Sequence, residues 1–196
     1  KIAEEFCEEF AGAFPFSLTG AQKKVIGDIS RDMKSSSPMH RLLQGDVGCG
    51  KTLVAFFGCA VAHTNGLQSA FMAPTEILAN QHYETATKLL SAMGIAPLLL
   101  KGDLKKSERQ EVIAKIRQGA PLIIGTHALI QEDVEFNKLG IAVIDEQHRF
   151  GVIQRSLLKK KGANPDVIVM TATPIPRTLT MTVFGDLDVS VIDELP

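Results

Sequence analysis

Eight consecutive residues follow the pattern Gly-x-x-x-x-Gly-Lys-Thr, the spacing of a phosphate-binding loop. They are Gly45, Asp46, Val47, Gly48, Cys49, Gly50, Lys51 and Thr52. In such a loop, glycines let backbone N–H groups converge on phosphate oxygens, the lysine supplies a cation and the threonine hydroxyl is a ligand for Mg²⁺. The alternative is a glycine-rich turn with an exposed lysine. An apolar run before the loop and a helix-like stretch after it favour binding of the phosphates of ATP together with Mg²⁺.

Two adjacent carboxylates follow an apolar run later in the chain, where residues 141–148 read Ile-Ala-Val-Ile-Asp-Glu-Gln-His. In open α/β sheets ligands bind beyond the carboxyl ends of the strands, where this pair would lie. Asp145 would then hold Mg²⁺, mostly through water, and Glu146 would orient and deprotonate the attacking water. Alone, the pair could equally be a solvated strand end. With the phosphate-binding loop in the same chain, it is the acidic half expected of an ATP hydrolase.

Two kinds of segment alternate along the chain and must position these groups. Apolar runs of strand length occupy residues 41–44, 69–72, 97–100, 122–125, 141–144, 167–170 and 189–192. Stretches with helical spacing occupy residues 51–64, 75–93 and 105–118, and a further helix is expected from Thr19, as N-cap, to about Met33. Continuous apolar strands indicate a sheet covered by helices on both faces. The alternation predicts an α/β fold with a mostly parallel sheet but does not predict the strand order.

Composition narrows the class of protein. The chain has 196 residues, of which 45% are hydrophobic, with a net charge of −1, values that exclude a disordered chain. Its apolar runs are too short for a membrane helix, and the acidic start does not fit a signal peptide. Three cysteines without metal-ligand spacing indicate a reducing compartment, so we expect a cytoplasmic protein. Because the chain opens at Lys1 without a methionine, we expect it to be part of a longer protein.

Several segments resemble motifs of superfamily 2 helicases in the order in which those proteins carry them. The acidic element Asp-Glu-Gln-His at 145–148 resembles the Asp-Glu-x-His box of these helicases. Residues 19–22 (Thr-Gly-Ala-Gln) resemble the glutamine motif that reads adenine. Residues 73–76 and 125–127 resemble motifs that contact the nucleic-acid strand, and residues 171–173 (Thr-Ala-Thr) the motif that couples hydrolysis to movement.

The likeness narrows to the bacterial RecG family of branched-DNA translocases. It is carried by residues 145–152 (Asp-Glu-Gln-His-Arg-Phe-Gly-Val), by residues 171–179 and by residues 185–196. The transcription-repair coupling factor is similar but has Glu-Gln where this chain has Gln147 and His148, which favours RecG. The resemblance covers about residues 14–196 and implies the first RecA-like motor domain, a P-loop NTPase domain that binds ATP. Residues 1–13 would then be a connector from an upstream region.

The resemblance also implies roles for individual residues and for partners. Gln22 would bind adenine, and His148 would join Lys51, Asp145 and Glu146 in catalysis. Two further sets of residues would bind DNA and couple ATP hydrolysis to movement. The DNA-binding set is Pro74, Thr75, Gly125 and Thr126, and the coupling set is Thr171 and Thr173. The partners implied are forks and Holliday junctions of double-stranded DNA, a second motor domain, and a DNA-binding wedge domain of the same parent chain. The isolated chain would be nearly inactive without that second motor domain.

Other functions are compatible with parts of this pattern. A phosphate-binding loop alone would also fit a nucleotide-dependent switch or a small-molecule kinase, and a domain could keep ATP as a structural ligand. The segments 73–75 and 171–173 have no evident task in a kinase, and the intact Lys51 and Glu146 argue against a non-catalytic domain. Among motors, an RNA helicase or a coupling-factor-like protein is the alternative. Whether Arg149, Arg155 and Arg177 contact DNA or brace the domain is left open by the sequence.

Overall fold

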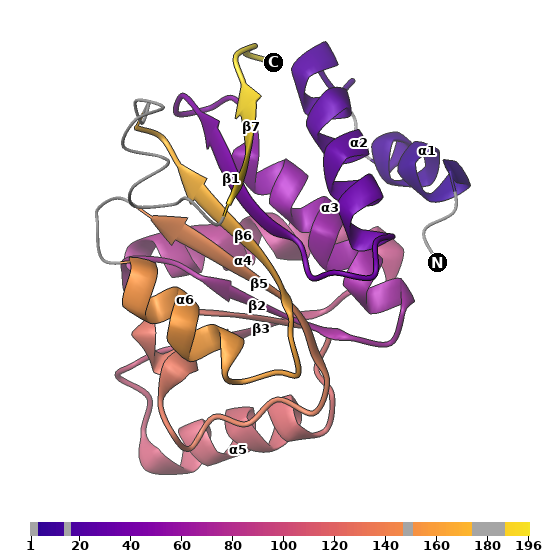
Figure 1. Ribbon diagram of the computed structural model, residues 1–196. Coiled ribbons are helices and arrows are strands. Elements are labelled where there is room, and N and C mark those ends of the chain that lie inside the picture. The colour runs from indigo at the N-terminus through magenta and orange to yellow at the C-terminus, as the bar shows by residue number, and fades with distance from the viewer. Residues whose placement is uncertain (1–3, 14–16, 147–150, 174–186) are drawn as a thin grey trace.

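Seven parallel strands form the central sheet of the computed structural model, which describes residues 4–13, 17–146, 151–173 and 187–196 (Figure 1). The strand order is β3-β4-β2-β5-β6-β1-β7, and all the strand pairs are parallel. The strands are β1 (His40–Gly45), β2 (Gln68–Met72), β3 (Pro97–Leu100), β4 (Leu122–Gly125), β5 (Leu139–Glu146), β6 (Asp166–Thr171) and β7 (Asp188–Ile192). The parallel arrangement brings the carboxyl ends of all seven strands to one edge of the sheet.

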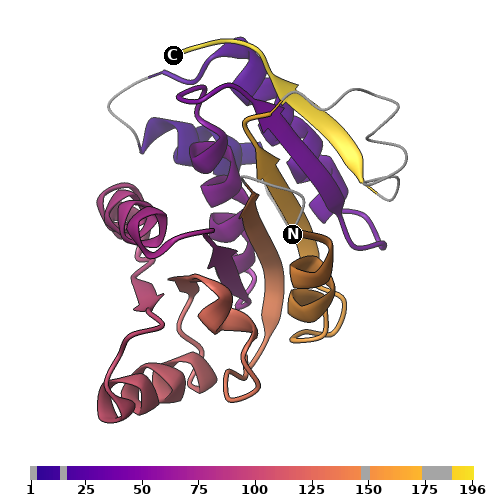
Figure 2. The same ribbon diagram turned by 90° about the vertical axis from the view of Figure 1, so that its left-hand side faces the viewer.

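Helices cover both faces of this sheet, as the turned view in Figure 2 shows. On one face lie α1 (Glu4–Gly12), α2 (Gly20–Met33), α3 (Lys51–Thr64) and α4 (Glu76–Leu90), which the short helix η1 (Ser91–Met93) extends. On the other face lie α5 (Lys106–Arg117), η2 (His127–Ile130) and α6 (Gly151–Lys159). Successive strand residues point to opposite faces, so Phe71 packs in the first layer while Ala70 and Met72 pack in the second.

The predicted α/β fold class is confirmed, and each of the seven predicted strands is present. Among the described residues, the helices α1 and α6 and the short helix η2 were not predicted from the sequence. In α1, Phe10 is fully buried and packs edge-on against Phe57 of α3, with ring centroids 5.2 Å apart. The segment expected to be a connector therefore contributes to the core, and the proposed domain boundary at residue 14 remains a prediction.

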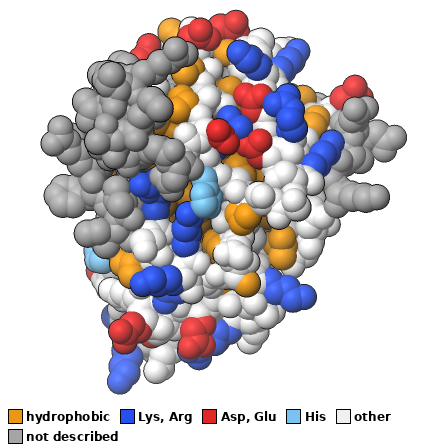
Figure 3. Space-filling view, in the orientation of Figure 1, with side chains coloured by type: hydrophobic (Ala, Val, Ile, Leu, Met, Phe, Trp, Pro, Cys, Tyr) orange, Lys and Arg blue, Asp and Glu red, His pale blue; other side chains and the backbone are white. Residues whose placement is uncertain are grey.

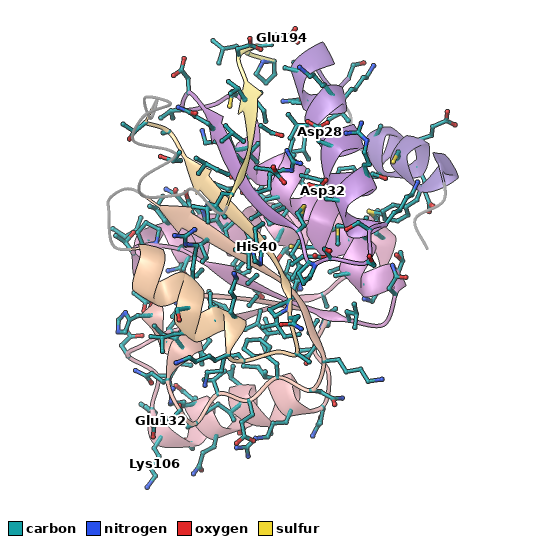
Figure 4. The ribbon with its side chains drawn as sticks, viewed as in Figure 1. Asp28, Asp32, His40, Lys106, Glu132 and Glu194 are labelled. Atoms are coloured by element: carbon teal, nitrogen blue, oxygen red, sulfur yellow. The ribbon has the colours of Figure 1, made fainter. Side chains whose placement is uncertain are left out.

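Helix α2, which begins beside the phosphate-binding loop, is tied to β1 and β7 by polar contacts. Asp28 and Asp32 lie one turn apart on this helix (Figure 4). Arg41 of β1 donates to Asp32 and, at 2.6 Å, to the Ser190 hydroxyl, which itself donates to Asp28. Glu194, beyond β7, accepts from the backbone N–H of Ala21 at 3.0 Å. These bonds fix both the start and the last turns of α2 against the sheet.

Within the described residues, the helices are all too short or too polar to cross a membrane.

Candidate nucleotide-binding site

The phosphate-binding loop connects the end of β1 to the first turn of α3. Gly48 and Gly50 adopt positive φ angles of 85° and 89°, a backbone conformation that side chains with a Cβ rarely adopt. Gly50 is the N-cap of α3, so the loop ends where the helix presents its first backbone N–H groups. The positive end of the helix dipole lies at the same place, and it favours a bound anion.

Lys51 directs its ammonium group back over the loop. Its Nζ donates to the carbonyl oxygens of Gly45 at 2.6 Å and Asp46 at 2.7 Å. Ionised phosphate oxygens would attract this ammonium group more strongly than the neutral carbonyls do, because both partners of the hydrogen bond would then be charged. Val47 is 84% exposed at the tip of the loop, and Thr52 lies half-buried in the first turn of α3. The loop therefore offers a cation, helical N–H groups and a hydroxyl within one turn of chain.

The two acidic residues lie at the same sheet edge as the loop. In the strand register, Gln44 of β1 pairs with Thr171 of β6, and Thr171 pairs with Glu146 of β5. Neighbouring strands are about 4.8 Å apart, so the backbone of Glu146 lies about 10 Å from that of Gln44. Asp145 is one residue earlier on β5, with a side chain that is 20% exposed. The side chain of Glu146, and His148 altogether, lie outside the described residues.

Asp145 has a protein partner that the sequence did not indicate. The Nε2 atom of His82, on α4, lies 2.8 Å from Asp145 Oδ2. The ring of His82 is buried against Phe71 of β2, with centroids 4.7 Å apart. Helical spacing places His82 on the sheet-facing side of α4 with Ala79 and Ala86. This spacing is the one sequence pattern that could have indicated a buried position for His82.

Gln22 adjoins the loop, but its amide is engaged within the protein. The side chain is 2% exposed; its Oε1 accepts from Thr19 N at 3.0 Å and its Nε2 donates to Cys49 O at 2.8 Å. Together with the bond from Gln22 N to Thr19 Oγ1, these contacts form a capping box that starts α2. The predicted contact with adenine would require Gln22 to exchange its bond to Cys49.

The residues predicted to contact DNA gather beside the carboxyl ends of β2 and β4. Pro74 and Thr75 are exposed after β2, and the Thr75 hydroxyl caps α4 by accepting from Leu78 N at 3.2 Å. Gly125 ends β4, where its carbonyl accepts from Ala73 N at 2.8 Å. Thr126, which follows, is buried. The two strand ends are therefore hydrogen-bonded to each other.

Glu76, which sequence reasoning did not single out, connects this group to a third strand end. Its Oε1 accepts from the Thr126 hydroxyl at 3.3 Å and from the backbone N–H of Gly102, just after β3, at 2.9 Å. Because the Thr126 hydroxyl already donates to Glu76, a contact with a DNA phosphate at this position would be made by the backbone. Glu76 thus holds the ends of β3 and β4 against the start of α4.

The predicted coupling residues lie between the loop and the acidic pair. Thr171 ends β6 and is buried, and its Oγ1 accepts from Thr173 N at 3.2 Å. Gln44, the last residue but one of β1, donates from Nε2 to Thr173 O at 3.3 Å. The turn after β6 is therefore held to the strand that leads into the phosphate-binding loop.

Of the three arginines whose roles the sequence left open, the structure describes one. Arg155 is buried on α6, which favours a bracing role, whereas Arg149 and Arg177 lie outside the described residues. On the face drawn in Figure 3, lysine and arginine side chains are interspersed with acidic ones and form no continuous basic surface outside the grey atoms. That distribution agrees with the balanced composition of the chain.

The donor set suits a nucleotide with its divalent cation better than a metal held by protein alone. Within the described ranges, no three His, Cys, Asp or Glu side chains gather into a metal-binding cluster. Mg²⁺ in nucleotide sites takes only one or two protein oxygens and completes its shell with phosphate and water. Thr52 and Asp145 are the oxygen donors that would serve at this edge.

Comparison with known proteins gives consistent matches over most or all of the chain. The DEAD/DEAH box helicase family model matches residues 19–182. The ATP-dependent DNA helicase RecG of Streptococcus pneumoniae is 57% identical over 94% of the chain, and that of Thermotoga maritima 51% identical over 100%. A solved structure of RecG bound to a three-way DNA junction has a TM-score of 0.86 and 47% identity, covering 100% of this chain and 26% of that one. The chain spans about a quarter of these relatives, 27% and 25% of their lengths.

Proposed function

The chain belongs to the RecG family of ATP-dependent DNA helicases, and from this premise we propose that residues 14–196 form the first of two RecA-like motor domains of a DNA translocase. The predicted resemblance to this family is confirmed. The proposed activity of the complete protein is ATP-driven movement on double-stranded DNA, which remodels forks and Holliday junctions.

One observation carries the catalytic part of the proposal. The register from Gln44 through Thr171 to Glu146 aligns the ends of β1, β6 and β5 across three adjacent strands. This alignment supports a single site in which the phosphate-binding loop, the coupling turn and the acidic pair act on one nucleotide. The register places the acidic pair two strands from the loop, within reach of a nucleotide whose phosphates the loop would bind.

The residues would divide the work of ATP hydrolysis. The ammonium group of Lys51 exchanges its carbonyl acceptors for the β- and γ-phosphate oxygens, while the first N–H groups of α3 hold the same phosphates. Mg²⁺, when bound, neutralises charge that develops on the phosphates. Thr52 and Asp145 would hold the cation, and Glu146 would orient the attacking water and take its proton. We further expect His148 to take part in catalysis and Gln22 to meet the adenine ring.

The neighbouring strand ends would provide the DNA-binding side. Thr75 starts a helix whose first N–H groups can bind a phosphate, and Gly125 and Thr126 add backbone groups beside it. The bonds from Glu76 to Thr126 and Gly102 support a fixed spacing between these contacts. Thr171 and Thr173, which lie between the two sides, would transmit the state of the nucleotide to the DNA.

The proposed partners include further domains of the complete protein, because the chain spans only about a quarter of the length of its RecG relatives. A second motor domain would supply arginines that reach the γ-phosphate, a contribution of about a thousandfold or more to turnover. A wedge domain of the same parent chain would direct the motor to branched DNA, and we expect the protein to act in the cytoplasm. The isolated chain would bind nucleotide weakly and hydrolyse it very slowly.

A comparison of binding and turnover tests this proposal. The purified chain and Lys51→Ala should be titrated with a fluorescent ADP in Mg²⁺, and ATP hydrolysis measured with forked DNA, linear duplex and RNA. We expect binding that Lys51→Ala abolishes, and slow turnover that none of the three nucleic acids stimulates. Failure to bind nucleotide would refute the site. Turnover of about 1 s⁻¹ or faster with strong DNA stimulation would refute the need for a second domain, since that is the range of complete enzymes. Stimulation by RNA alone would favour an RNA helicase.

A further inference from the structure

His82 reaches the acidic pair from a helix that the nucleotide chemistry does not otherwise use. It lies in the second turn of α4, and its Nε2 is 2.8 Å from Asp145 Oδ2. The contact joins residues 63 positions apart, so it depends on how α4 packs against the sheet. The contact is made to one oxygen of the Asp145 carboxylate.

The direction of this hydrogen bond follows from the chemistry of the acceptor. An ionised carboxylate has no proton to donate, so the imidazole must donate its Nε2–H to Oδ2. The bond is charge-assisted and lies in a mostly buried setting, where the side chains of His82 and Asp145 are 11% and 20% exposed. It therefore restricts the rotation of the Asp145 carboxylate about its side-chain bonds.

The setting of the ring makes this restriction effective. Phe71 packs on the imidazole at a centroid distance of 4.7 Å, and the ring is almost excluded from solvent. Phe71 lies on β2, which pairs directly with β5, the strand that carries Asp145. Phe71 thus holds the donor beside the strand that carries the acceptor.

We propose that His82 is a positioning residue that commits Oδ2 of Asp145 to the protein and leaves Oδ1 to serve Mg²⁺ in the nucleotide complex. The proposal rests on the function proposed above for the nucleotide site. Carboxylates that bind metals are commonly oriented by an outer hydrogen bond, and loss of such a partner weakens metal binding roughly tenfold to a hundredfold. We expect the lower end of that range, because Asp145 would act mostly through bound water.

The gain in nucleotide affinity that Mg²⁺ confers is the quantity to measure. The dissociation constant of a fluorescent ADP should be determined for the chain in excess Mg²⁺ and in EDTA. His82→Ala should lose about tenfold of the Mg²⁺-dependent gain while its affinity in EDTA stays that of the unchanged chain. His82→Phe keeps a ring against Phe71 but has no donor, so it should behave as His82→Ala. His82→Gln places an N–H near the position of Nε2 and should restore most of the gain.

Two controls separate positioning from a general effect on folding. His63→Ala changes a histidine in the last turn of α3, away from the nucleotide site, and should leave both affinities unchanged. In an Asp145→Asn background, His82→Ala should have no further effect on the Mg²⁺-dependent gain, because the carboxylate it orients is gone. Circular dichroism and thermal unfolding of every variant would show that the domain is folded.

Several results would overturn the proposal. It fails if His82→Ala and His82→Phe keep the full Mg²⁺-dependent gain, or if they weaken binding equally in Mg²⁺ and in EDTA. It also fails if a long-range ¹⁵N–¹H spectrum of the unchanged chain shows neutral His82 with its proton on Nδ1, a measurement that requires no variant to fold. If the unchanged chain binds no nucleotide, the proposed function falls and this inference with it; normal binding with unaffected variants would refute the inference alone.

Discussion

Replacement of Gly50 by alanine should weaken both the fold and nucleotide binding more than the same change at Gly48. Both residues have left-handed backbones, with φ of 89° and 85°. They differ in their surroundings. A Cβ on Gly50 would lie 2.3 Å from Gln22 Nε2, whereas a Cβ on Gly48 would meet nothing within 4 Å. The pair therefore separates backbone strain from the contact between the loop and α2.

The magnitude follows from these two terms. A left-handed conformation costs a residue with a Cβ about 1–2 kcal/mol, and this term applies to both variants. At Gly50 the Gln22 amide must also move, which breaks its bond to Cys49 O and leaves a buried amide at a cost of about 1–3 kcal/mol. We expect Gly48→Ala to lower the free energy of unfolding by about 1–2 kcal/mol and Gly50→Ala by about 2–5 kcal/mol.

Urea unfolding followed by circular dichroism would measure both variants, and a fluorescent ADP would measure their affinities. A double variant with Gln22→Ala gives the decisive comparison, since without the Gln22 amide the extra cost at Gly50 should largely disappear. Equal destabilisation by Gly48→Ala and Gly50→Ala, or an unchanged extra cost in the Gln22→Ala background, would refute the reasoning.

Further outcomes follow from other residues. In the full-length parent protein, Glu146→Gln should retain nucleotide with Mg²⁺ and lose most turnover; hydrolysis at the native rate would remove Glu146 as the base. Burial raises the pKa of Cys59 to about 12 from 9.0, so its thiol should resist a disulfide reagent near neutral pH until urea unfolds the chain, and rapid labelling of folded protein would contradict this. Burial also raises the pKa of Asp166 above 3.8, so this carboxyl lowers stability as pH rises through its folded pKa. Asp166→Asn keeps an acceptor for Met39 N, and unfolding curves should show a variant at least as stable near neutral pH, with a smaller loss of stability from acid to neutral pH.

The strands and the phosphate-binding loop were predictable from local sequence. Continuous apolar runs such as 122–125 and 141–144 fit strands that are buried on both faces of a sheet. The spacing of residues 45–52 is specific to a phosphate-binding loop by itself. The order of the strands was not predictable, because it depends on how each connection crosses the sheet. The helix α1 was missed, although Phe6 and Phe10 lie one turn apart and both pack against Phe57.

The site was predictable in its residue types and less so in its contacts. Asp145 was expected to bind metal, but its partner His82 is 63 residues away and belongs to another element. Glu76 likewise joins Thr126 and Gly102 only because three strand ends meet. The engagement of Gln22 by Cys49 depends on the position of α2 beside the loop. Such contacts come from the tertiary arrangement, and no short motif contains them.

The position of the bound nucleotide tests the central claim most directly. Backbone amide chemical shifts of the chain should be recorded while ADP with Mg²⁺ is added. We predict that the largest changes fall at residues 45–52, 145–146 and 171–173, the shared carboxyl edge of β1, β5 and β6, and that Lys51→Ala abolishes them. Changes concentrated at the opposite edge, around residues 65–67 and 118–121, or no changes at all, would contradict the claim that this chain carries the ATP site of a helicase motor.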